Sequence, residues 1–141
     1  MELKMTGETF KDLITIMKMK GDHEVVRVSA NRDGLHIAFT DLSHVFMAIL
    51  NVPKGSFLEY SCDDPMEFAF ELDMIYWGTR PYKKDDTIKV TVGERLDVEK
   101  NNNVKFSMPT ADVDTVPPVK EIELHLENYF VISLQDLKEA L

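Results

Sequence analysis

The sequence predicts an α+β fold in which two helices pack on antiparallel sheet. Most of residues 1–110 consists of short segments with an apolar residue at every second position, the period of strands that bury one face. Two other stretches place apolar residues three and four positions apart, the period of an amphipathic helix. The order is strand, helix, three strands, and then two strands, helix, three strands. This approximate repetition predicts one domain built from two similar halves.

The first half opens with a predicted strand at 2–5 and a predicted helix at 8–20. Thr6 is a suitable N-cap, and Gly21 is a suitable residue to end the helix. One helix face is apolar and contains Phe10, Leu13, Ile14 and Met17. A second stripe carries lysines, and periodicity alone fits these to a solvated face that complements the helix dipole. A strand at 24–30 follows.

The most apolar part of the chain is the stretch 34–53. It is predicted as two strands, 34–40 and 44–52, joined by a turn at 41–43. Apolar residues alternate in the first strand and occupy nearly every position of the second, so this pair should lie within a packed sheet. Asp41 and His44 stand at the turn beside this apolar wall, which makes a polar surface feature on a rigid support.

The second half contains one helix and five strands. The helix is predicted at 72–80, where Gly78 weakens it and Pro81 stops it. Its apolar side would face inward, whereas Trp77 and Arg80 would point away. The predicted strands are 57–62, 66–70, 87–92, 95–100 and 104–108.

The composition changes after Pro109. Residues 110–120 lack a clear period and contain Pro117-Pro118, which predicts an extended connector. Residues 121–126 alternate as a strand, and Ser133 is a candidate cap for a helix with an apolar stripe of Leu134, Leu137 and Leu141. This strand, cap and helix parallel the start of the chain.

Charge and composition exclude several classes of function. The net charge of −9 argues against a protein that coats nucleic acid, although residues 111–141 carry 7 acidic and only 2 basic residues, so the body is nearly balanced. The single Cys62 cannot form an internal disulfide, which fits a reducing, intracellular compartment. No apolar run approaches the roughly 20 residues of a membrane helix. No catalytic, metal or cofactor motif is present, so a non-enzymatic protein is expected.

Three short motifs carry a family resemblance. They are Asp33-Gly34, Asp41-x-Ser43-His44-Val45 and Phe57-x-x-Tyr60-x-Cys62-Asp63. In order and spacing this run resembles the first domain of the PCNA-family DNA sliding clamps of archaea and eukaryotes. The resemblance implies the DNA-clamp fold, with a clamp N-terminal domain at 1–110, an interdomain connector at 111–120 and the beginning of a second clamp domain at 121–141.

The resemblance also implies a function. Clamps of this family are polymerase processivity factors that encircle duplex DNA, are loaded by a clamp loader, and tether DNA polymerase, nucleases and ligase through PIP-box motifs. They act in the cytoplasm of archaea or in the eukaryotic nucleus. Because most of a second domain is absent here, a ring would need a homo-oligomer or the missing half. The alternative is a solitary clamp-like module that binds PIP-box peptides or another clamp subunit, as a regulator or decoy, without encircling DNA.

A partner-peptide groove is implied between the turn and the connector. Matched by position, its residues are Thr40, Leu42, His44, Val45, Val116 and Val119. A short helical turn with apolar anchors fits a groove flanked by an extended strand. The residues alone also fit a plainer reading, in which His44 satisfies its own turn and Val116 packs locally.

Two further surfaces are implied by the same resemblance. The DNA-facing cations on or beside the two helices are Lys11, Lys18, Lys20, Arg80, Lys83 and Lys84. They would contact the phosphate backbone without reading sequence. The subunit or domain edges are the strands that contain Phe57, Tyr60, Val104, Phe106 and Met108. Unpaired edges of this kind tend to recruit further strands.

Overall fold

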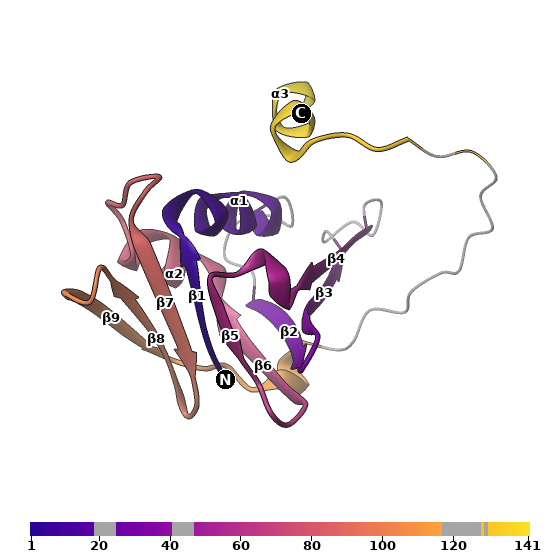
Figure 1. Cartoon of the computed structure of the whole chain (residues 1–141). Coiled ribbons are helices and arrows are strands. Elements are labelled where there is room, and N and C mark those ends of the chain that lie inside the picture. The colour runs from indigo at the N-terminus through magenta and orange to yellow at the C-terminus, as the bar shows by residue number, and fades with distance from the viewer. Residues whose placement is uncertain (19–24, 41–46, 117–127, 129) are drawn as a thin grey trace.

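The computed structural model describes residues 1–18, 25–40, 47–116, 128 and 130–141. Two antiparallel sheets lean together, and helix α1 lies across the opening between them (Figure 1). The five-stranded sheet has the order β5 (Glu59–Ser61), β1 (Glu2–Thr6), β7 (Thr87–Val92), β8 (Arg95–Lys100) and β9 (Val104–Pro109). The four-stranded sheet has the order β4 (Met47–Pro53), β3 (Gly34–Thr40), β2 (Val25–Asn31) and β6 (Met66–Glu71). The predicted α+β class and the duplicated order of elements are confirmed.

The two halves exchange their first strands. Strand β1 opens the first half but pairs with β7 of the second half, from Glu2 opposite Thr91 to Thr6 opposite Thr87. Strand β6 opens the second half but pairs with β2 of the first, from Val25 opposite Glu71 to Ala30 opposite Met66. Each sheet therefore contains three consecutive strands of one half and the leading strand of the other, so neither half is complete without its partner.

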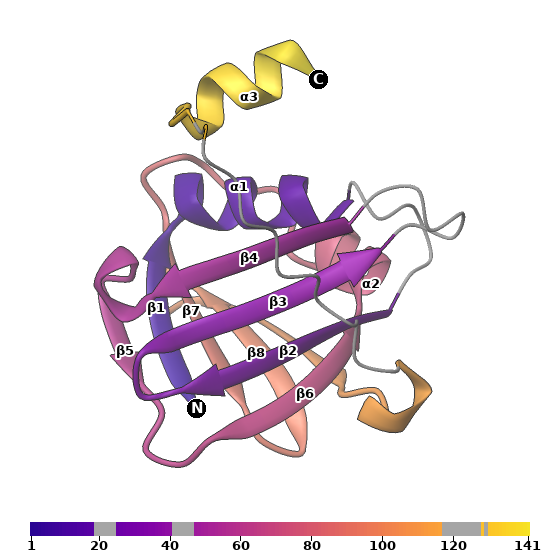
Figure 2. The same cartoon turned by 90° about the vertical axis from the view of Figure 1, so that its right-hand side faces the viewer.

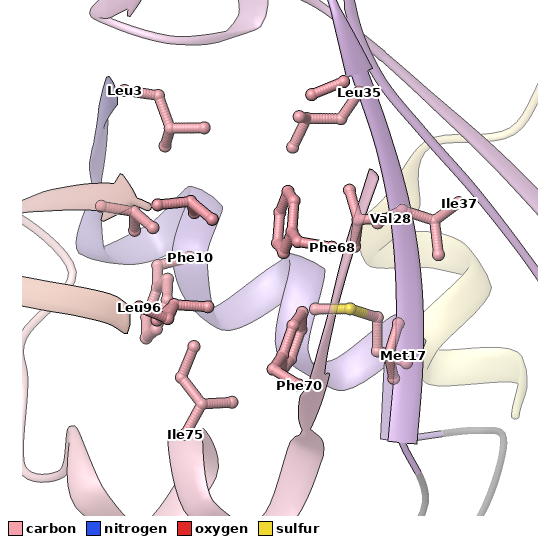
Figure 3. Packing of buried hydrophobic residues seen from close by; sticks show 14 of the residues in the cluster. Leu3, Phe10, Met17, Val28, Leu35, Ile37, Phe68, Phe70, Ile75 and Leu96 are labelled. Atoms are coloured by element: carbon pink, nitrogen blue, oxygen red, sulfur yellow. The ribbon is translucent and has the colours of Figure 1, made fainter. Parts of the chain in front are cut away.

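The core lies between the inner faces of the two sheets and beneath the helices. Alternation along each strand sends one set of side chains inward, and Phe39 is only 1% exposed while Leu72 is fully buried. Figure 3 shows the side chains that meet there, among them Leu3, Phe10, Met17, Val28, Leu35, Ile37, Phe68, Phe70, Ile75 and Leu96. Truncating a buried phenylalanine of this kind to alanine typically costs about 3–5 kcal/mol, so this cluster is the main source of stability.

Helix α1 (Gly7–Met17) starts as predicted. The Thr6 hydroxyl accepts a hydrogen bond from the backbone N–H of Thr9 at 3.2 Å, which caps the first turn. Phe10, Ile14 and Met17 are buried, as their spacing predicts. Described residues of the helix end at Met17 with Lys18 as C-cap, so the predicted extension to Lys20 and the stop at Gly21 lie outside the described part of the chain.

Helix α2 (Leu72–Gly78) is shorter than the predicted range 72–80. Thr79 is its C-cap and bonds the carbonyl of Ile75 through both its backbone N–H and its hydroxyl, so the helix ends two residues earlier than Pro81 alone would require. Leu72 and Ile75 are buried, whereas Trp77 is exposed, as predicted.

Two other predicted elements need correction. The predicted strand 57–62 is reduced to β5, because a 3-10 turn, η2 (Lys54–Ser56), precedes it and the backbone N–H of Phe57 bonds the carbonyl of Lys54. The connector is not wholly extended, because it contains a second 3-10 turn, η3 (Val113–Thr115). There the Asp112 carboxylate accepts a hydrogen bond from the backbone N–H of Asp114 at 3.0 Å. A local side-chain cap thus folds a segment whose composition suggests extension.

The C-terminal helix α3 (Leu134–Ala140) lies over α1 (Figure 1). Ser133 caps it as predicted, since its hydroxyl accepts a hydrogen bond from the backbone N–H of Asp136 at 3.2 Å. Lys138 of α3 bonds Asp12 of α1 at 3.1 Å. The predicted strand 121–126 lies outside the described residues. No helix in the described part of the chain is long and apolar enough to cross a membrane.

We expect Gly34→Ala to destabilise the domain strongly. Gly34 has a φ of +147°, and a Cβ at this position would lie 2.1 Å from the backbone oxygen of Val52. Backbone strain and a clash with an adjacent strand should together cost about 3 kcal/mol, measured as a lower midpoint of urea unfolding. Gly55→Ala is the matched control, because a Cβ added there would have no neighbour within 4 Å. Equal midpoints for the two variants would contradict the strain argument.

Candidate functional site

The outer face of the four-stranded sheet is the first candidate site. Figure 2 looks onto this face, with β4, β3, β2 and β6 side by side. Strands β3 and β4 lead into and out of the segment 41–46, which contains the predicted turn. The start of the connector is attached to β6 and β2. Both walls of the predicted groove are therefore anchored on one sheet.

Backbone pairing and one arginine attach the connector. The backbone N–H of Ala111 donates to the carbonyl of Ala69 in β6 at 2.8 Å, which adds a bridge to the sheet edge. Arg27 of β2 donates from Nη1 to the carbonyl of Val116 at 2.9 Å and to that of Val113 at 3.4 Å. Its other terminal nitrogen bonds the carboxylate of Glu67. The fork of the guanidinium thus ties two strands to the turn η3.

The floor between these walls is largely apolar. Inward and outward side chains alternate along each strand, and the outward set near the 41–46 segment comprises Val25, Ala38, Thr40, Met47 and Ile49. Met47 is 37% exposed and Ile49 is 44% exposed, although both are large apolar residues on a sheet. Sequence reasoning missed this floor, because β4 is apolar at nearly every position and its two faces cannot be told apart by pattern alone.

The predicted groove residues are only partly within the described structure. Thr40 is the last residue of β3 and lies opposite Met47 in the register with β4. Val116 is the C-cap of η3, half-buried and held by Arg27. Leu42, His44, Val45 and Val119 lie outside the described residues. Arg27 and Glu67, which position the connector, were not predicted, because only the tertiary fold brings residues 27, 67 and 116 together.

The second candidate site is the cationic side formed by α1 and the loop after α2. The backbone N–H of Gly7 bonds the carbonyl of Asp86 at 2.7 Å, and that of Glu8 bonds the carbonyl of Lys84 at 3.0 Å. These bonds satisfy two of the free N–H groups at the start of α1. They also place Lys83 and Lys84 beside the first turn of α1, with Lys11 exposed further along the helix.

The loop that carries these lysines is itself ordered by Asp86. Its carboxylate accepts hydrogen bonds from the amide of Asn101 at 3.0 Å and from the backbone N–H of Lys83 at 2.7 Å. These bonds, with that to Asn101 the larger cause, hold the pKa of Asp86 below its ordinary value. An ionised Asp86 therefore keeps the 83–86 turn closed against α1.

The remaining described cations, Lys18 and Arg80, meet at the far end of α1. Lys18 Nζ lies 3.6 Å from the ring centroid of Tyr76, and the Arg80 guanidinium lies 4.5 Å from the same centroid. Five of the six predicted DNA-facing cations are thus brought to the side of the domain where α1 and α2 lie. Lys20 lies outside the described residues.

Two acidic residues of α1 moderate this charge. Glu8 lies 3.8 Å from Lys84, and Asp12 lies 3.1 Å from Lys138. The Glu8 and Lys84 side chains are 57% and 78% exposed, so their pair contributes little stability and leaves Lys84 able to exchange partners.

The third candidate site is the pair of edge strands of the five-stranded sheet. Among the described strands, β5 pairs only with β1, and β9 pairs only with β8. The predicted edges are therefore the observed ones. However, Phe57 and Met108 are buried and Phe106 packs against Gly78, so these side chains belong to the domain's own interior. Each edge offers backbone groups, with Val104 as the one predicted edge residue that is well exposed, at 54%.

Tyr60 connects the β5 edge to the other sheet. Its hydroxyl donates toward the carbonyls of Asn31 and Gly34 in the β2–β3 turn, and its ring stacks on Phe57 at 5.5 Å. Burial, with the charge of the neighbouring Cys62 as the next cause, raises the pKa of Tyr60 to about 12. The neutral hydroxyl is the form that ties the sheets together.

No metal centre is formed within the part of the chain that the structure describes. There, no group of three or more His, Cys, Asp and Glu side chains is arranged to hold an ion. Cys62 is buried, and its thiol lies 3.2 Å from the carbonyl of Asp64.

Curated relatives of this chain are archaeal DNA polymerase sliding clamps. It is 29% identical to that of Picrophilus torridus over 133 residues, which are 93% of this chain and 54% of that protein. It is 25% identical to that of Thermoplasma acidophilum over 140 residues, 99% of this chain and 56% of that protein. The chain therefore spans about half the length of the curated relatives it matches. No protein-family model matches it.

Solved structures with the same fold are structures of PCNA. A structure of the C-terminal region of FEN-1 bound to Archaeoglobus fulgidus PCNA matches with a TM-score of 0.76 at 24% identity, over 87% of this chain and 51% of that chain. A PCNA2–PCNA3 complex from Sulfolobus tokodaii matches with a TM-score of 0.69 at 19% identity, over 92% and 52%. The two sheets and their helices thus define a DNA-clamp domain. Together with the curated relatives, this fold confirms the resemblance to PCNA-family sliding clamps.

We expect the Tyr60 tether to weaken at high pH. An unfolded tyrosine ionises near pH 10, whereas Tyr60 in the folded chain holds its proton to about pH 12. Its contribution to stability is therefore complete below about pH 10 and is lost as the pH rises through about 12. The free energy of unfolding, measured with urea across this window, should fall more steeply in the native protein than in Tyr60→Phe.

Comparing the two proteins isolates Tyr60 from other groups. Burial also raises the pKa of Tyr82, and the hydrogen bond to Glu2 raises that of Lys89, so both lower stability in the same pH range. These effects are common to the native protein and the variant. Parallel pH profiles for the two would contradict the assigned role of Tyr60.

Proposed function

We propose that this chain forms a wall segment of a DNA sliding clamp, a polymerase processivity factor that encircles duplex DNA. The observation that carries the proposal is the alignment of sliding clamps from two archaea with 93% and 99% of the chain. The clamp fold and the cations gathered beside α1 and α2 support it. The alternative of a solitary decoy module is not favoured, because the relatives are named as polymerase clamps.

The chain is proposed to supply the first domain, residues 1–110, the connector, residues 111–120, and the opening of a second domain, residues 121–141. Two observations support this division. The bridge between Ala111 and Ala69 attaches the connector at the edge of the first domain. Helix α3 begins with a serine cap, as α1 begins with a threonine cap, which agrees with a second strand–cap–helix unit.

Ring closure is proposed to use the backbone edges β5 and β9. A further domain pairs with β5, and a neighbouring subunit pairs with β9, either from more copies of this chain or from the rest of a longer clamp. Head-to-tail addition of this kind closes when the rotation between subunits divides a full turn. The oligomeric PCNA2–PCNA3 complex with the same fold supports assembly through such domains.

DNA is proposed to pass beside α1 and α2. Lys11, Lys18, Arg80, Lys83 and Lys84, with Lys20, would face the phosphate backbone. Such contacts are sequence-independent and salt-sensitive, which suits a clamp that slides. Topological enclosure, rather than tight binding, then holds the ring on DNA and keeps its clients at high local concentration.

Client proteins are proposed to dock in the groove over the four-stranded sheet. Thr40, Leu42, His44 and Val45 form one wall and Val116 and Val119 the other, above the apolar floor that includes Met47 and Ile49. The clients are DNA polymerase, nucleases and ligase with PIP-box motifs, and a clamp loader. The A. fulgidus PCNA structure with a bound C-terminal region of FEN-1 supports this class of partner. The protein acts inside the cell and has no catalytic step of its own.

His44→Ala combined with Val45→Ala should weaken binding of a labelled PIP-box peptide. Loss of two wall contacts is expected to raise the Kd about tenfold or more, measured by fluorescence polarisation. Lys105→Ala is the control, because Lys105 lies on β9, 61% exposed and remote from the groove. An unchanged Kd in the double variant would remove the groove assignment.

Charge reversal of the proposed DNA face should weaken duplex binding. Lys11→Glu with Lys84→Glu removes two phosphate contacts and is expected to lower the slope of log K against log salt by about 2, measured by anisotropy of a labelled duplex. Lys54→Glu with Lys105→Glu changes the net charge equally at exposed lysines away from α1. If both double variants lose the same affinity, the effect is one of overall charge, and the face is wrongly assigned.

A further inference from the structure

An exposed tryptophan on α2 sits within a group of cations that packing does not require. We define the aromatic–cation cluster as Lys18, Tyr76, Trp77 and Arg80. Trp77 is 68% exposed, the most exposed of the aromatic or sulfur-containing residues in the two helices that follow β1 and β6. The buried side of α2 is already formed by Leu72 and Ile75, and Gly78 packs on the ring of Phe106. Trp77 is therefore not a core residue.

The ring of Trp77 is nevertheless held in place. It meets the ring of Tyr76 edge to face, with centroids 5.0 Å apart and an angle of 79° between the planes. Arg80 lies 6.0 Å from the Trp77 centroid and donates a hydrogen bond to the Tyr76 hydroxyl. Lys18 covers Tyr76 from α1 at 3.6 Å. Two helices thus support an aromatic surface that stays open to solvent.

The charge around this surface is positive. Lys18 and Arg80 both touch the aromatic rings, and Asp73, one turn before Trp77, is the acidic residue of α2. A planar aromatic ring flanked by two cations is complementary to a ligand that has a planar base and flanking phosphates. Duplex DNA does not use the ring, because its bases already stack on one another and only its phosphates face outward.

We propose that the aromatic–cation cluster binds unpaired nucleotides of single-stranded nucleic acid. A base stacks on Trp77, while Lys18 and Arg80 contact the phosphates on either side. Base stacking on an aromatic side chain tolerates any base, so the site has little sequence preference. This inference goes beyond the proposed encirclement of duplex DNA, because a stacked base needs no closed ring.

The chain itself provides the reporter for the first test. Trp77 is its single tryptophan, so the tryptophan fluorescence of the unmodified protein reports on this ring alone. Titration with an oligothymidylate of about 15 nucleotides should quench this fluorescence, because a base stacks on the indole. Inorganic polyphosphate, which carries the charge without bases, should not. No quenching by the oligonucleotide, or equal quenching by polyphosphate, would overturn the proposal.

A second measurement tests the residue by substitution. Trp77→Ala should weaken binding of a labelled oligothymidylate about tenfold in an anisotropy titration, and Trp77→Tyr should restore most of the affinity. Leu58→Ala is the control for loss of an exposed apolar side chain, because Leu58 is 61% exposed before β5. Circular dichroism checks that each variant is folded. Equal affinity of Trp77→Ala and Leu58→Ala would overturn the proposal.

A third comparison separates this site from the proposed clamp function. Trp77→Ala should leave affinity for a blunt duplex unchanged, whereas Lys11→Glu with Lys84→Glu lowers it. If the double variant keeps its duplex affinity, the assigned duplex-facing surface fails while single-strand stacking stands. If Trp77→Ala loses duplex and single-strand affinity alike, the ring serves general binding and the proposal of a site for unpaired bases is wrong.

Discussion

The exchange of β1 and β6 between the two halves is the constraint on which the rest of the structure depends. Helix α1 begins directly after β1, and α2 begins directly after β6, so the strand pairings decide where both helices start. Because each leading strand lies in the other half's sheet, the two helices come together on one side of the domain. Lys18 of α1 then reaches the ring of Tyr76 in α2, and the loop after α2 bonds to the first turn of α1. The cationic side is therefore a consequence of the strand exchange.

The same exchange leaves three separate surfaces for three kinds of contact. The helices occupy one side, the outer face of the four-stranded sheet carries the connector, and the edges β5 and β9 keep free backbone groups. The surfaces are mechanically linked, because Tyr60 joins the β5 edge to the β2–β3 turn and Arg27 joins β2 to the connector. A protein that must join its neighbours, enclose a duplex and hold clients at once needs such a division.

Local patterns predicted most elements well where their signals are local. The alternation in β7 and β8 and the cap at Thr6 depend only on neighbours in the chain, and both are found as predicted. The helix at 72–80 and the strand at 57–62 were predicted too long, because Thr79 and the turn η2 end them through bonds that pattern does not reveal. Arg27 and Glu67 were missed for a different reason. Arg27 bonds residues 89 and 40 positions away, and no periodicity marks such a pair.

By itself, the sequence determined the α+β class, the order of strands and helices, and which residues are apolar enough to form the core, because these follow from propensity and periodicity along a few turns of chain. It also carried the motifs that point to a clamp. The tertiary structure alone decided which strands exchange, which edges remain open, and that Lys18, Tyr76, Trp77 and Arg80 form one cluster. Those outcomes depend on contacts between segments far apart in the chain, and such contacts are selected by the packing of the whole domain.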